Sequence, residues 1–345
     1  MKRYRIATIP GDGIGPEVVE AATAVLDVAA RRFGFTLDFE RLPYGADHYL
    51  ATGETLPEHA FVHLRDDVDA MLLGAVGDPR VPGNEHARDI LLGLRFRLDL
   101  YINLRPVVLL HPDITPLKAA GPIDFVIFRE NTEGLYLARG RTQGQEHIAE
   151  EVNTERGVER IIRAAFEYAH THGRRRVTMS DKSNAIPAHR IWQTTFKTVA
   201  AGFPSIQAEH RYVDALAMEM VRNPQRFDVI VTNNLYGDIL SDLGAGLVGG
   251  LGLAASANLH PGRPGLFEPV HGSAPLLAGK DRANPLAAIL TSAMMLADLG
   301  QADAAARLDG AVRGALAAGI RTPDLGGTTG TREVARWVME QVGTG

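Results

Sequence analysis

Two aspartates four residues apart are the strongest sign of chemistry in this sequence. Asp238 and Asp242 follow a short apolar strand, Val229 to Val231, and lie in a segment of helical period. Residues at this spacing share one face of a helix, where two carboxylates repel each other unless a positive charge lies between them. A solvated acidic face is the alternative, but most neighbouring residues are apolar or glycine. The pair therefore favours a hard divalent cation, Mg²⁺ or Mn²⁺, which prefers carboxylate oxygen.

Three arginines are candidates for binding an acidic substrate. Arg105 precedes a proline at a predicted strand start, Arg129 follows the apolar run 125–128, and Arg95 lies in Leu-Arg-Phe-Arg. Strand ends are where an α/β sheet builds its sites. Arginine binds carboxylates through two parallel hydrogen bonds, so three arginines together suit a di- or tricarboxylic acid. For Arg97 a surface salt bridge is the better interpretation.

Three further residues are candidates for chemistry, and two of them also have a plain structural interpretation. Lys182 follows the predicted strand 177–180, where a nearby metal ion or arginine could lower its pKa so that it acts as a base. Taken alone, Lys182 would be a solvated surface residue. Asp214, where a strand gives way to a helix, could supply a third carboxylate. For Tyr136 a buried structural role is the default.

Composition excludes several classes of protein. The chain has 345 residues, a net charge of −5 and no cysteine. The charge gives no reason to expect nucleic acid or an anionic membrane surface as a partner, and the missing cysteines exclude disulfides, thiolate catalysis and zinc–thiolate sites. No apolar run is long enough to span a bilayer, and the N-terminus leads straight into a strand instead of a signal peptide. A cytoplasmic protein is expected.

The elements that must position these residues alternate between strand and helix. Strands are predicted over residues 6–9, 36–42, 70–73, 105–110, 125–128, 177–180 and 227–231, and helices over 16–32, 57–65, 154–171, 187–201, 283–299 and 302–318. This order is typical of an α/β fold with a largely parallel sheet. No flexible linker is apparent, so a domain boundary would be a crossing of the chain between two packed bodies.

The glycine-rich turn at residues 11–17, Gly-Asp-Gly-Ile-Gly-Pro-Glu, lies between a predicted strand and helix, as a dinucleotide-binding fingerprint should. The third glycine of that fingerprint is missing, and Pro16 follows Gly15. A structural turn is at least as good an interpretation, and the ordinary Rossmann site is excluded.

Several long motifs together resemble one family, the metal-dependent β-decarboxylating dehydrogenases, which act on isopropylmalate, isocitrate, homoisocitrate or tartrate/D-malate. The resemblance covers essentially the whole chain. Its motifs are the turn at 11–17, Leu-Asp-Leu-Tyr-Ile-Asn-Leu-Arg-Pro at 98–106, Arg-Glu-Asn-Thr-Glu-Gly at 129–134, Asn-Asn-Leu-Tyr-Gly-Asp-Ile-Leu-Ser-Asp at 233–242, Phe-Glu-Pro-Val-His-Gly-Ser-Ala-Pro at 267–275 and Pro-Asp-Leu-Gly-Gly at 323–327.

The resemblance implies a role for each candidate. Asp238 and Asp242 would bind the metal ion together with Asp214 from the partner subunit of a homodimer. The partner would also supply Lys182 as the base, and Tyr136 would be the acid. The substrate would meet Arg95, Arg105, Arg129, Leu91 and Leu92. The cofactor, NAD or NADP, would lie on Glu268, His271, Gly272, Ser273, Ala274, Leu276, Asn284 and Asn184.

The resemblance also implies an isopropylmalate dehydrogenase-like open sheet in two domains, with a cofactor site that is not of the Rossmann type. Residues 1–98 and 250–345 would form the large cofactor-binding domain. Residues 99–249 would form a small, dimer-forming domain with a β-arm near 135–152.

Six positions bear on the cofactor and the substrate, and together they leave both choices open. Leu276 stands where relatives that use NAD carry an aspartate, and Arg282 could meet the 2′-phosphate of NADP. Leu91 and Leu92 match the apolar wall of isopropylmalate enzymes, whereas Ala185 in Lys-Ser-Asn-Ala-Ile is closer to the tartrate/D-malate type. Arg88 replaces a family glutamate, and solvent exposure is a slightly better interpretation for it than contact with a substrate anion.

Oxidative decarboxylation of a D-malate-type diacid, with 3-isopropylmalate as the first substrate, is therefore the leading function. A tartrate/D-malate dehydrogenase and a homologue recruited to a specialised pathway with another 3-substituted malate are the alternatives of the same chemistry. A non-catalytic regulatory subunit is the alternative of another class. It is disfavoured because Tyr136, Lys182 and all three aspartates are present.

Overall fold

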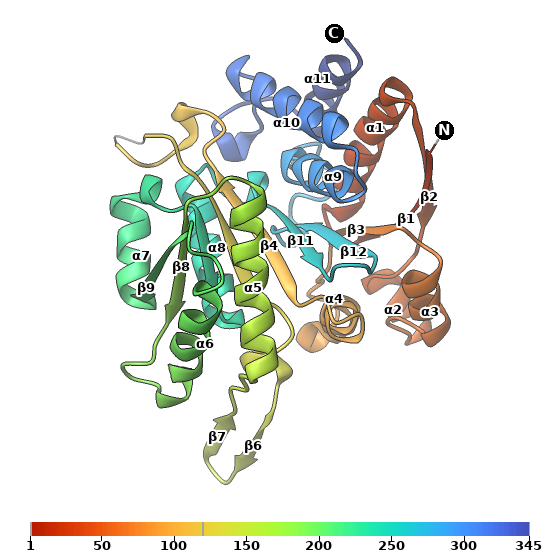
Figure 1. Cartoon of the computed structure of the whole chain (residues 1–345). Coiled ribbons are helices and arrows are strands. Elements are labelled where there is room, and N and C mark those ends of the chain that lie inside the picture. Colours follow the sequence, from red (N-terminus) through yellow and green to blue (C-terminus); the bar gives the residue numbers. More distant parts are fainter. Residues whose placement is uncertain (1, 119–120, 345) are drawn as a thin grey trace. The chain divides into compact units, whose positions relative to one another are not determined.

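The chain folds into two compact units. A computed structural model describes residues 2–118 and 121–344. The terminal unit comprises Met1–Leu98, Leu110–Ile114 and Gly249–Gly345, and the central unit comprises Asp99–Leu109 and Thr115–Val248. Residues 110–114 and 249 thus group with the terminal unit, whereas the expected boundaries assign them to the middle domain. Figure 1 shows that both units combine strands with covering helices.

The terminal unit contains five strands in the order β2-β1-β3-β12-β11. Their bounds are β1 (Lys2–Gly11), β2 (Phe35–Arg41), β3 (Ala70–Ala75), β11 (Ala255–Leu259) and β12 (Gly265–Pro269). All the pairings are parallel except that of β11 with β12. Every residue of β3 is buried, which is typical of a central parallel strand covered on both faces.

Seven α-helices belong to the described part of the terminal unit: α1 (Gly15–Phe33), α2 (Ala46–Thr52), α3 (Glu58–Asp66), α4 (Glu85–Arg97), α9 (Leu286–Asp298), α10 (Ala302–Ala317) and α11 (Thr331–Gly343). Proline at the first turn opens α1, and Gly34 in the left-handed conformation closes it. Helix α9 packs on β11 and β12 and is buried along most of its length.

The central unit contains five strands in the order β4-β5-β10-β8-β9, namely β4 (Ile102–Val108), β5 (Asp124–Glu130), β8 (Arg176–Asp181), β9 (Gln207–Tyr212) and β10 (Val229–Thr232). Only the β4–β5 pairing is antiparallel among those described within this unit. Its α-helices are α5 (Glu155–Thr171), α6 (Arg190–Ala200), α7 (Val213–Arg222) and α8 (Asn234–Leu247). One apolar core, which includes Phe125, Phe227 and Leu240, joins β5 and β10 to α7 and α8.

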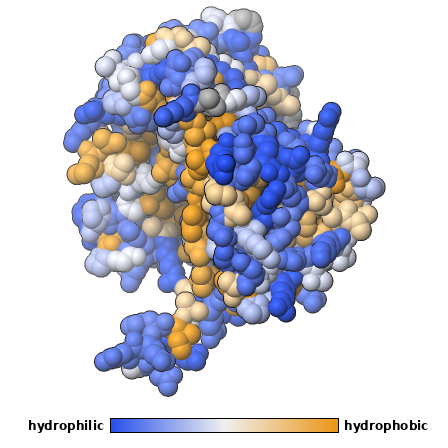
Figure 2. Space-filling view, turned by 90° about the vertical axis from the view of Figure 1, so that its left-hand side faces the viewer, coloured by the Kyte–Doolittle hydropathy of each residue, from blue (hydrophilic) through white to orange (hydrophobic). Residues whose placement is uncertain are grey.

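A two-stranded hairpin, β6 (Gly140–Gln143) and β7 (Glu146–Ala149), extends from the central unit (Figure 1). All its residues are exposed except Ile148, which is half-buried. Its surface is largely hydrophilic at the lower end of Figure 2. The hairpin falls within the expected β-arm at 135–152.

The fold confirms the predicted mixed α/β class. Each predicted helix corresponds to an observed one, but β11, β12, α2 and α11 were not predicted. The predicted start of a strand at Arg105 is wrong. Strand β4 begins at Ile102, because Ile102 and Leu104 extend the ladder opposite Glu130 and Phe128. Within the described residues, no helix is both long and apolar enough to cross a membrane.

Candidate active site

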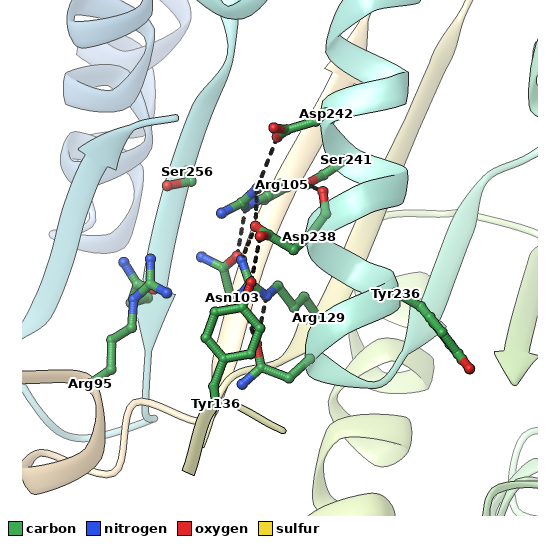
Figure 3. A network of polar contacts seen from close by, with 12 residues as sticks. Arg95, Asn103, Arg105, Arg129, Tyr136, Tyr236, Asp238, Ser241, Asp242 and Ser256 are labelled. Carbon is green, nitrogen blue, oxygen red and sulfur yellow. Dashed lines mark hydrogen bonds and ion pairs between the residues drawn. The ribbon is translucent and has the colours of Figure 1, made fainter. Parts of the chain in front are cut away.

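The two aspartates lie one turn apart on α8, beside two buried arginines of the central unit (Figure 3). Helix α8 is capped by Asn233, whose side chain accepts a hydrogen bond from the backbone N–H of Tyr236 over 2.9 Å. Gly237 allows the close approach, because a Cβ there would lie 2.6 Å from the Cβ of Arg129. The sequence prediction that Asp238 and Asp242 share a helix face is confirmed.

Arg129 is almost completely buried at the end of β5. Its Nε and Nη2 donate to Oδ1 of Asn234 over 2.9 and 2.7 Å, and its Nη1 donates to Oδ1 of Asp238. Asn234 therefore fixes one side of the guanidinium, while the other side contacts the carboxylate of Asp238 on α8. A buried charge of this kind is stable only because it is paired and hydrogen-bonded.

Arg105 reaches the same carboxylates from β4. Its Nη1 lies 3.2 Å from Oδ1 of Asp238 and 3.5 Å from Oδ1 of Asp242. Ser241 and Asn103 hold it by accepting hydrogen bonds over 2.6 and 2.7 Å. The structure thus brings two predicted substrate arginines and two predicted metal ligands into one group, which Figure 3 shows.

Tyr136 joins this group through its hydroxyl, which donates to Oδ2 of Asp238 over 2.6 Å. The guanidinium of Arg129 lies 5.0 Å from the centre of the tyrosine ring. Burial, followed by the hydrogen bond to Asp238, raises the pKa of Tyr136. The phenol therefore keeps its proton and can donate it. A purely structural role, the default interpretation of Tyr136 from the sequence, does not require such a contact with Asp238.

Asp242 is the more open of the two carboxylates, with 53% of its side chain exposed. Burial raises the pKa of its carboxyl, the charge of Asp238 adds to this rise, and Arg105 opposes it. The oxygens of Asp242 are thus available to a further cation. The donor set of two carboxylates is hard oxygen, which fits Mg²⁺ or Mn²⁺. In the described residues of a single chain, no three Asp, Glu or His side chains gather closely enough to form a metal site.

Lys182 and Asp214 form a separate pair in the central unit. Nζ of Lys182 donates to Oδ1 of Asp214 over 2.5 Å, and this hydrogen bond lowers the pKa of the carboxyl. Lys182 follows β8, and Asp214 lies in the first turn of α7. Asn184 lies exposed in the turn after Lys182, where it lines a polar cavity of about 620 Å³ along α6.

In the terminal unit, Arg95 is buried and its Nη2 donates to Oε1 of Glu268 over 2.5 Å. Asn258 donates to the same oxygen over 2.9 Å. Leu91 and Leu92 lie on α4 four and three residues before Arg95, so the three side chains share one face. The carboxylate of Glu268 therefore holds Arg95 in place.

A cavity of about 510 Å³ in the terminal unit is lined by four of the eight residues expected to bind the cofactor. Its lining consists of Ile14, Leu251, Gly252, His271, Gly272, Ala274, Leu277, Arg282, Ala283, Asn284, Pro323 and Asp324. Burial lowers the pKa of His271, which favours the neutral ring. Nδ2 of Asn284 donates to Oδ2 of Asp324 over 3.0 Å.

Not every expected cofactor residue lines this cavity. Ser273 is bonded to the glycine-rich turn and to Gly77, and Leu276 has 82% of its surface exposed. Sequence reasoning gave no role to Ile14, Leu251 or Asp324. The motif at 323–327 was the one signal in the sequence that could have pointed to Asp324. The place of Asp324 beside the cavity follows only from its contact with Asn284, 40 residues earlier in the chain.

Comparisons with known proteins agree with this geometry. Residues 5–338 match the family described as isocitrate/isopropylmalate dehydrogenase. The chain is 46% identical to a 3-isopropylmalate dehydrogenase of Thermobifida fusca, over 90% of both chains, and 48% identical to one of Clavibacter sepedonicus, over 91% of both.

Solved structures are similar along the whole chain. A crystal structure of isocitrate dehydrogenase from Methylococcus capsulatus is 38% identical, with a TM-score of 0.90 and coverage of 99% of this chain and 100% of that one. A β-decarboxylating dehydrogenase from Thermococcus kodakarensis is 36% identical, with a TM-score of 0.82 and coverage of 98% and 96%. The chain therefore belongs to the isocitrate/isopropylmalate dehydrogenase family and is an oxidative, β-decarboxylating dehydrogenase.

Proposed function

We propose that this enzyme oxidises and decarboxylates a (2R)-2-hydroxy diacid of the D-malate type, with 3-isopropylmalate as its substrate. It uses Mg²⁺ or Mn²⁺ and a nicotinamide dinucleotide. The observation that carries the proposal is the group formed by Arg105, Arg129, Tyr136, Asp238 and Asp242. It combines cations for carboxylates, hard oxygen ligands and a protonated phenol.

Asp238 and Asp242 would hold the divalent cation, with Asp214 of a second copy completing the ligand set. When bound, the cation stabilises negative charge on the substrate oxygens, and the nicotinamide ring accepts the hydride. Asp238 is already neutralised by two arginines, so Asp242 is the carboxylate whose charge the cation would chiefly compensate.

The arginines would bind the two carboxylates of the diacid. Arg129 presents a guanidinium that is fixed on one side by Asn234, and Arg105 is fixed by Ser241 and Asn103. Pre-oriented donors of this kind lose little side-chain entropy when an anion binds. Leu91 and Leu92 would face the 3-substituent, which favours an isopropyl group over a polar one.

Two residues would move protons. Lys182 of the second copy would accept the proton of the substrate hydroxyl, while the hydride leaves the carbon that bears this hydroxyl. The resulting 2-keto acid carries a carboxylate in the β position, which departs as CO₂. Tyr136 would then protonate the carbon that has lost CO₂, because its raised pKa keeps the proton on the phenol until that step.

A homodimer with shared sites is part of the proposal. Lys182 and Asp214 are paired to each other within one chain, apart from the α8 carboxylates. Helices α7 and α8 also expose apolar side chains, with Met218 54% and Ile239 59% exposed. Exposed apolar surface on adjacent helices is typical of an interface.

The cofactor would occupy the 510 Å³ cavity of the terminal unit, with its adenosine against Ile14 and Asn284. Asn184 of the second copy would lie near the nicotinamide. The leucine side chain at position 276 cannot bind a ribose hydroxyl or repel a 2′-phosphate. Discrimination between NAD and NADP would therefore depend on Arg282, which lines the cavity.

A substrate panel tests the proposal. Purified enzyme with Mn²⁺ is assayed against D-malate, tartrate, 3-isopropylmalate, isocitrate and homoisocitrate, each with NAD and with NADP. We expect 3-isopropylmalate to give the highest kcat/KM. A higher value for tartrate or D-malate would favour the alternative suggested by Ala185, and no turnover of any of these acids would contradict the proposal.

A further inference from the structure

His86 is a fully buried histidine to which the chemistry described so far assigns no role. It lies in the first turn of α4, the helix that carries Leu91, Leu92 and Arg95. Its Nε2 lies 2.8 Å from Oδ2 of Asp12, whose side chain is also buried. Because a carboxylate only accepts hydrogen bonds, Nε2 of His86 is the donor.

Asp12 connects His86 to two other segments of the terminal unit, those of Ala46 and Gly77. Its Oδ1 accepts from the backbone N–H of Ala46 over 2.6 Å, and its Oδ2 accepts from that of Gly77 over 2.7 Å. Asp12 stands in the glycine-rich turn between β1 and α1. Its two glycine neighbours have positive φ, and a Cβ on Gly13 would lie 1.9 Å from the carbonyl oxygen of Ser273. The turn is therefore fixed tightly against its neighbours.

The same turn is bonded to the loop that lines the cofactor cavity. The backbone N–H of Ile14 donates to the carbonyl of Ser273 over 2.8 Å, and Oγ of Ser273 donates to the carbonyl of Gly77 over 2.5 Å. Ile14 also lines the cavity itself. A continuous chain of hydrogen bonds thus leads from the cofactor cavity through Asp12 to the first turn of α4.

Packing alone does not explain a histidine at this position. Nδ1 of His86 is buried, and no hydrogen-bond partner for it is found within the described part of the chain. An unsatisfied buried polar atom is costly, whereas an apolar side chain of similar size would avoid that cost. The ring stacks on Tyr49 with 6.0 Å between centroids, a contact that phenylalanine could make equally well. What histidine adds is the bond to Asp12.

We propose that His86 is a positioning residue that couples the cofactor cavity to the substrate face of α4. Cofactor bound against Ile14 and the 271–284 loop fixes the glycine-rich turn, and the Asp12–His86 bond transmits this order to the helix carrying Leu91, Leu92 and Arg95. The inference rests on the proposed function, since it takes the cavity to be the dinucleotide site.

Amide hydrogen exchange tests the coupling without relying on turnover. Wild-type enzyme is compared with and without saturating NAD, and separately NADP, in peptides covering 271–284 and 85–97. We expect the dinucleotide to slow exchange in both peptides. His86→Leu and His86→Phe should keep the protection of 271–284 and lose that of 85–97, while His86→Gln, which retains an N–H donor, should restore it.

Kinetics supply a second measurement. In His86→Phe we expect the KM for the diacid to rise about tenfold, while the cofactor affinity measured without diacid changes less than twofold, since the coupling and not the cavity is lost. The control is His59→Leu, an exposed histidine on α3, which should match the wild type in both measurements. His86→Phe keeps the ring beside Tyr49, so it serves if His86→Leu does not fold.

The outcomes separate the coupling from the proposed function. If the dinucleotide protects 271–284 in the wild type but 85–97 exchanges equally with and without it, or is protected equally in His86→Phe, the coupling is wrong and the cofactor site stands. If neither dinucleotide protects 271–284 in the wild type, the cofactor site itself is wrong, and the coupling is overturned with it.

Discussion

Arg95 and Glu268 form a buried ion pair, with 2.5 Å between Nη2 and Oε1. The two residues were expected to serve different ligands, Arg95 the substrate and Glu268 the cofactor. Their direct contact means that Glu268 compensates the charge of Arg95 before any substrate carboxylate arrives. Removing one partner of a buried pair leaves the other charge uncompensated.

Replacement of this glutamate should shift affinity toward the diacid. In Glu268→Gln the uncompensated Arg95 should lower the free energy of unfolding by about 3 kcal/mol. Bound 3-isopropylmalate should recover much of this loss, and its Kd should fall, while the Kd of the cofactor stays within twofold. Thermal unfolding and calorimetric titration with each ligand measure these changes. Weaker cofactor binding at unchanged diacid affinity would return Glu268 to the cofactor site.

The metal proposal predicts the behaviour of Asp242→Asn. One charged oxygen ligand is lost, so Mn²⁺ binding should weaken and decarboxylation should be abolished. Titration of Mn²⁺ followed by its electron paramagnetic resonance signal gives the affinity directly. Asp309→Asn, on the surface of α10, is the matched control and should bind Mn²⁺ as the wild type does. Full activity in Asp242→Asn, or activity that survives a chelator, would exclude the proposed metal site.

Tyr136 and Lys182 should fail at different steps. Tyr136→Phe removes the proton donor to carbon, so release of protonated product should suffer more than hydride transfer. Lys182→Met removes the base, so hydride transfer itself should slow. Single-turnover assays with substrate deuterated at the 2-position time the two steps separately. The same step slowed equally in both variants would contradict this assignment of roles.

Cofactor preference should depend on Leu276. An aspartate there would accept hydrogen bonds from the adenosine ribose of NAD and repel the 2′-phosphate of NADP. Leu276→Asp should therefore raise the ratio of kcat/KM for NAD over NADP by at least about tenfold, the equivalent of 1.4 kcal/mol. Leu50→Asp, another exposed leucine, controls for the added charge. A wild type that already prefers NAD strongly, with no change in Leu276→Asp, would show that another residue reads the ribose.

Stability should depend on pH through Glu130. Burial raises the pKa of this carboxyl to about 7, although Thr132 and the backbone of Glu133 donate hydrogen bonds to it. The folded protein therefore holds a proton that the unfolded chain releases between pH 4.5 and about 7. The contribution is fully present below pH 4.5 and is lost as the pH rises toward 7, about 3 kcal/mol in all.

Urea unfolding across this pH range measures that loss. In Glu130→Gln the corresponding fall in the free energy of unfolding should be absent, while Glu146→Gln on the exposed hairpin should behave as the wild type does. Parallel pH profiles for Glu130→Gln and the wild type would show that another group titrates.

Local spacing made part of the site predictable. The shared face of Asp238 and Asp242 follows from helix geometry alone, and Arg129 was recognised because an apolar strand precedes it. Strand β11 was missed because its alanine, serine and asparagine residues have low strand propensity, and α2 because seven residues give too short a periodic signal.

Contacts between distant segments could not be predicted from the sequence. Arg95 and Glu268 are 173 residues apart, and Tyr136 and Asp238 are 102 apart. Whether a buried arginine meets substrate, a glutamate or both depends on the packing of α4 against β12, which no local pattern specifies. The role of His86 was hidden for the same reason, because its partner Asp12 lies 74 residues earlier.

The exposed β6–β7 hairpin has a consequence for the sensitivity of the protein to proteases. A two-stranded ribbon without a core is at best marginally stable in water, so its order depends on what covers it. We expect the second copy of the proposed dimer to cover it. An unassembled copy would then present an accessible loop to proteases, and the assembled enzyme would not.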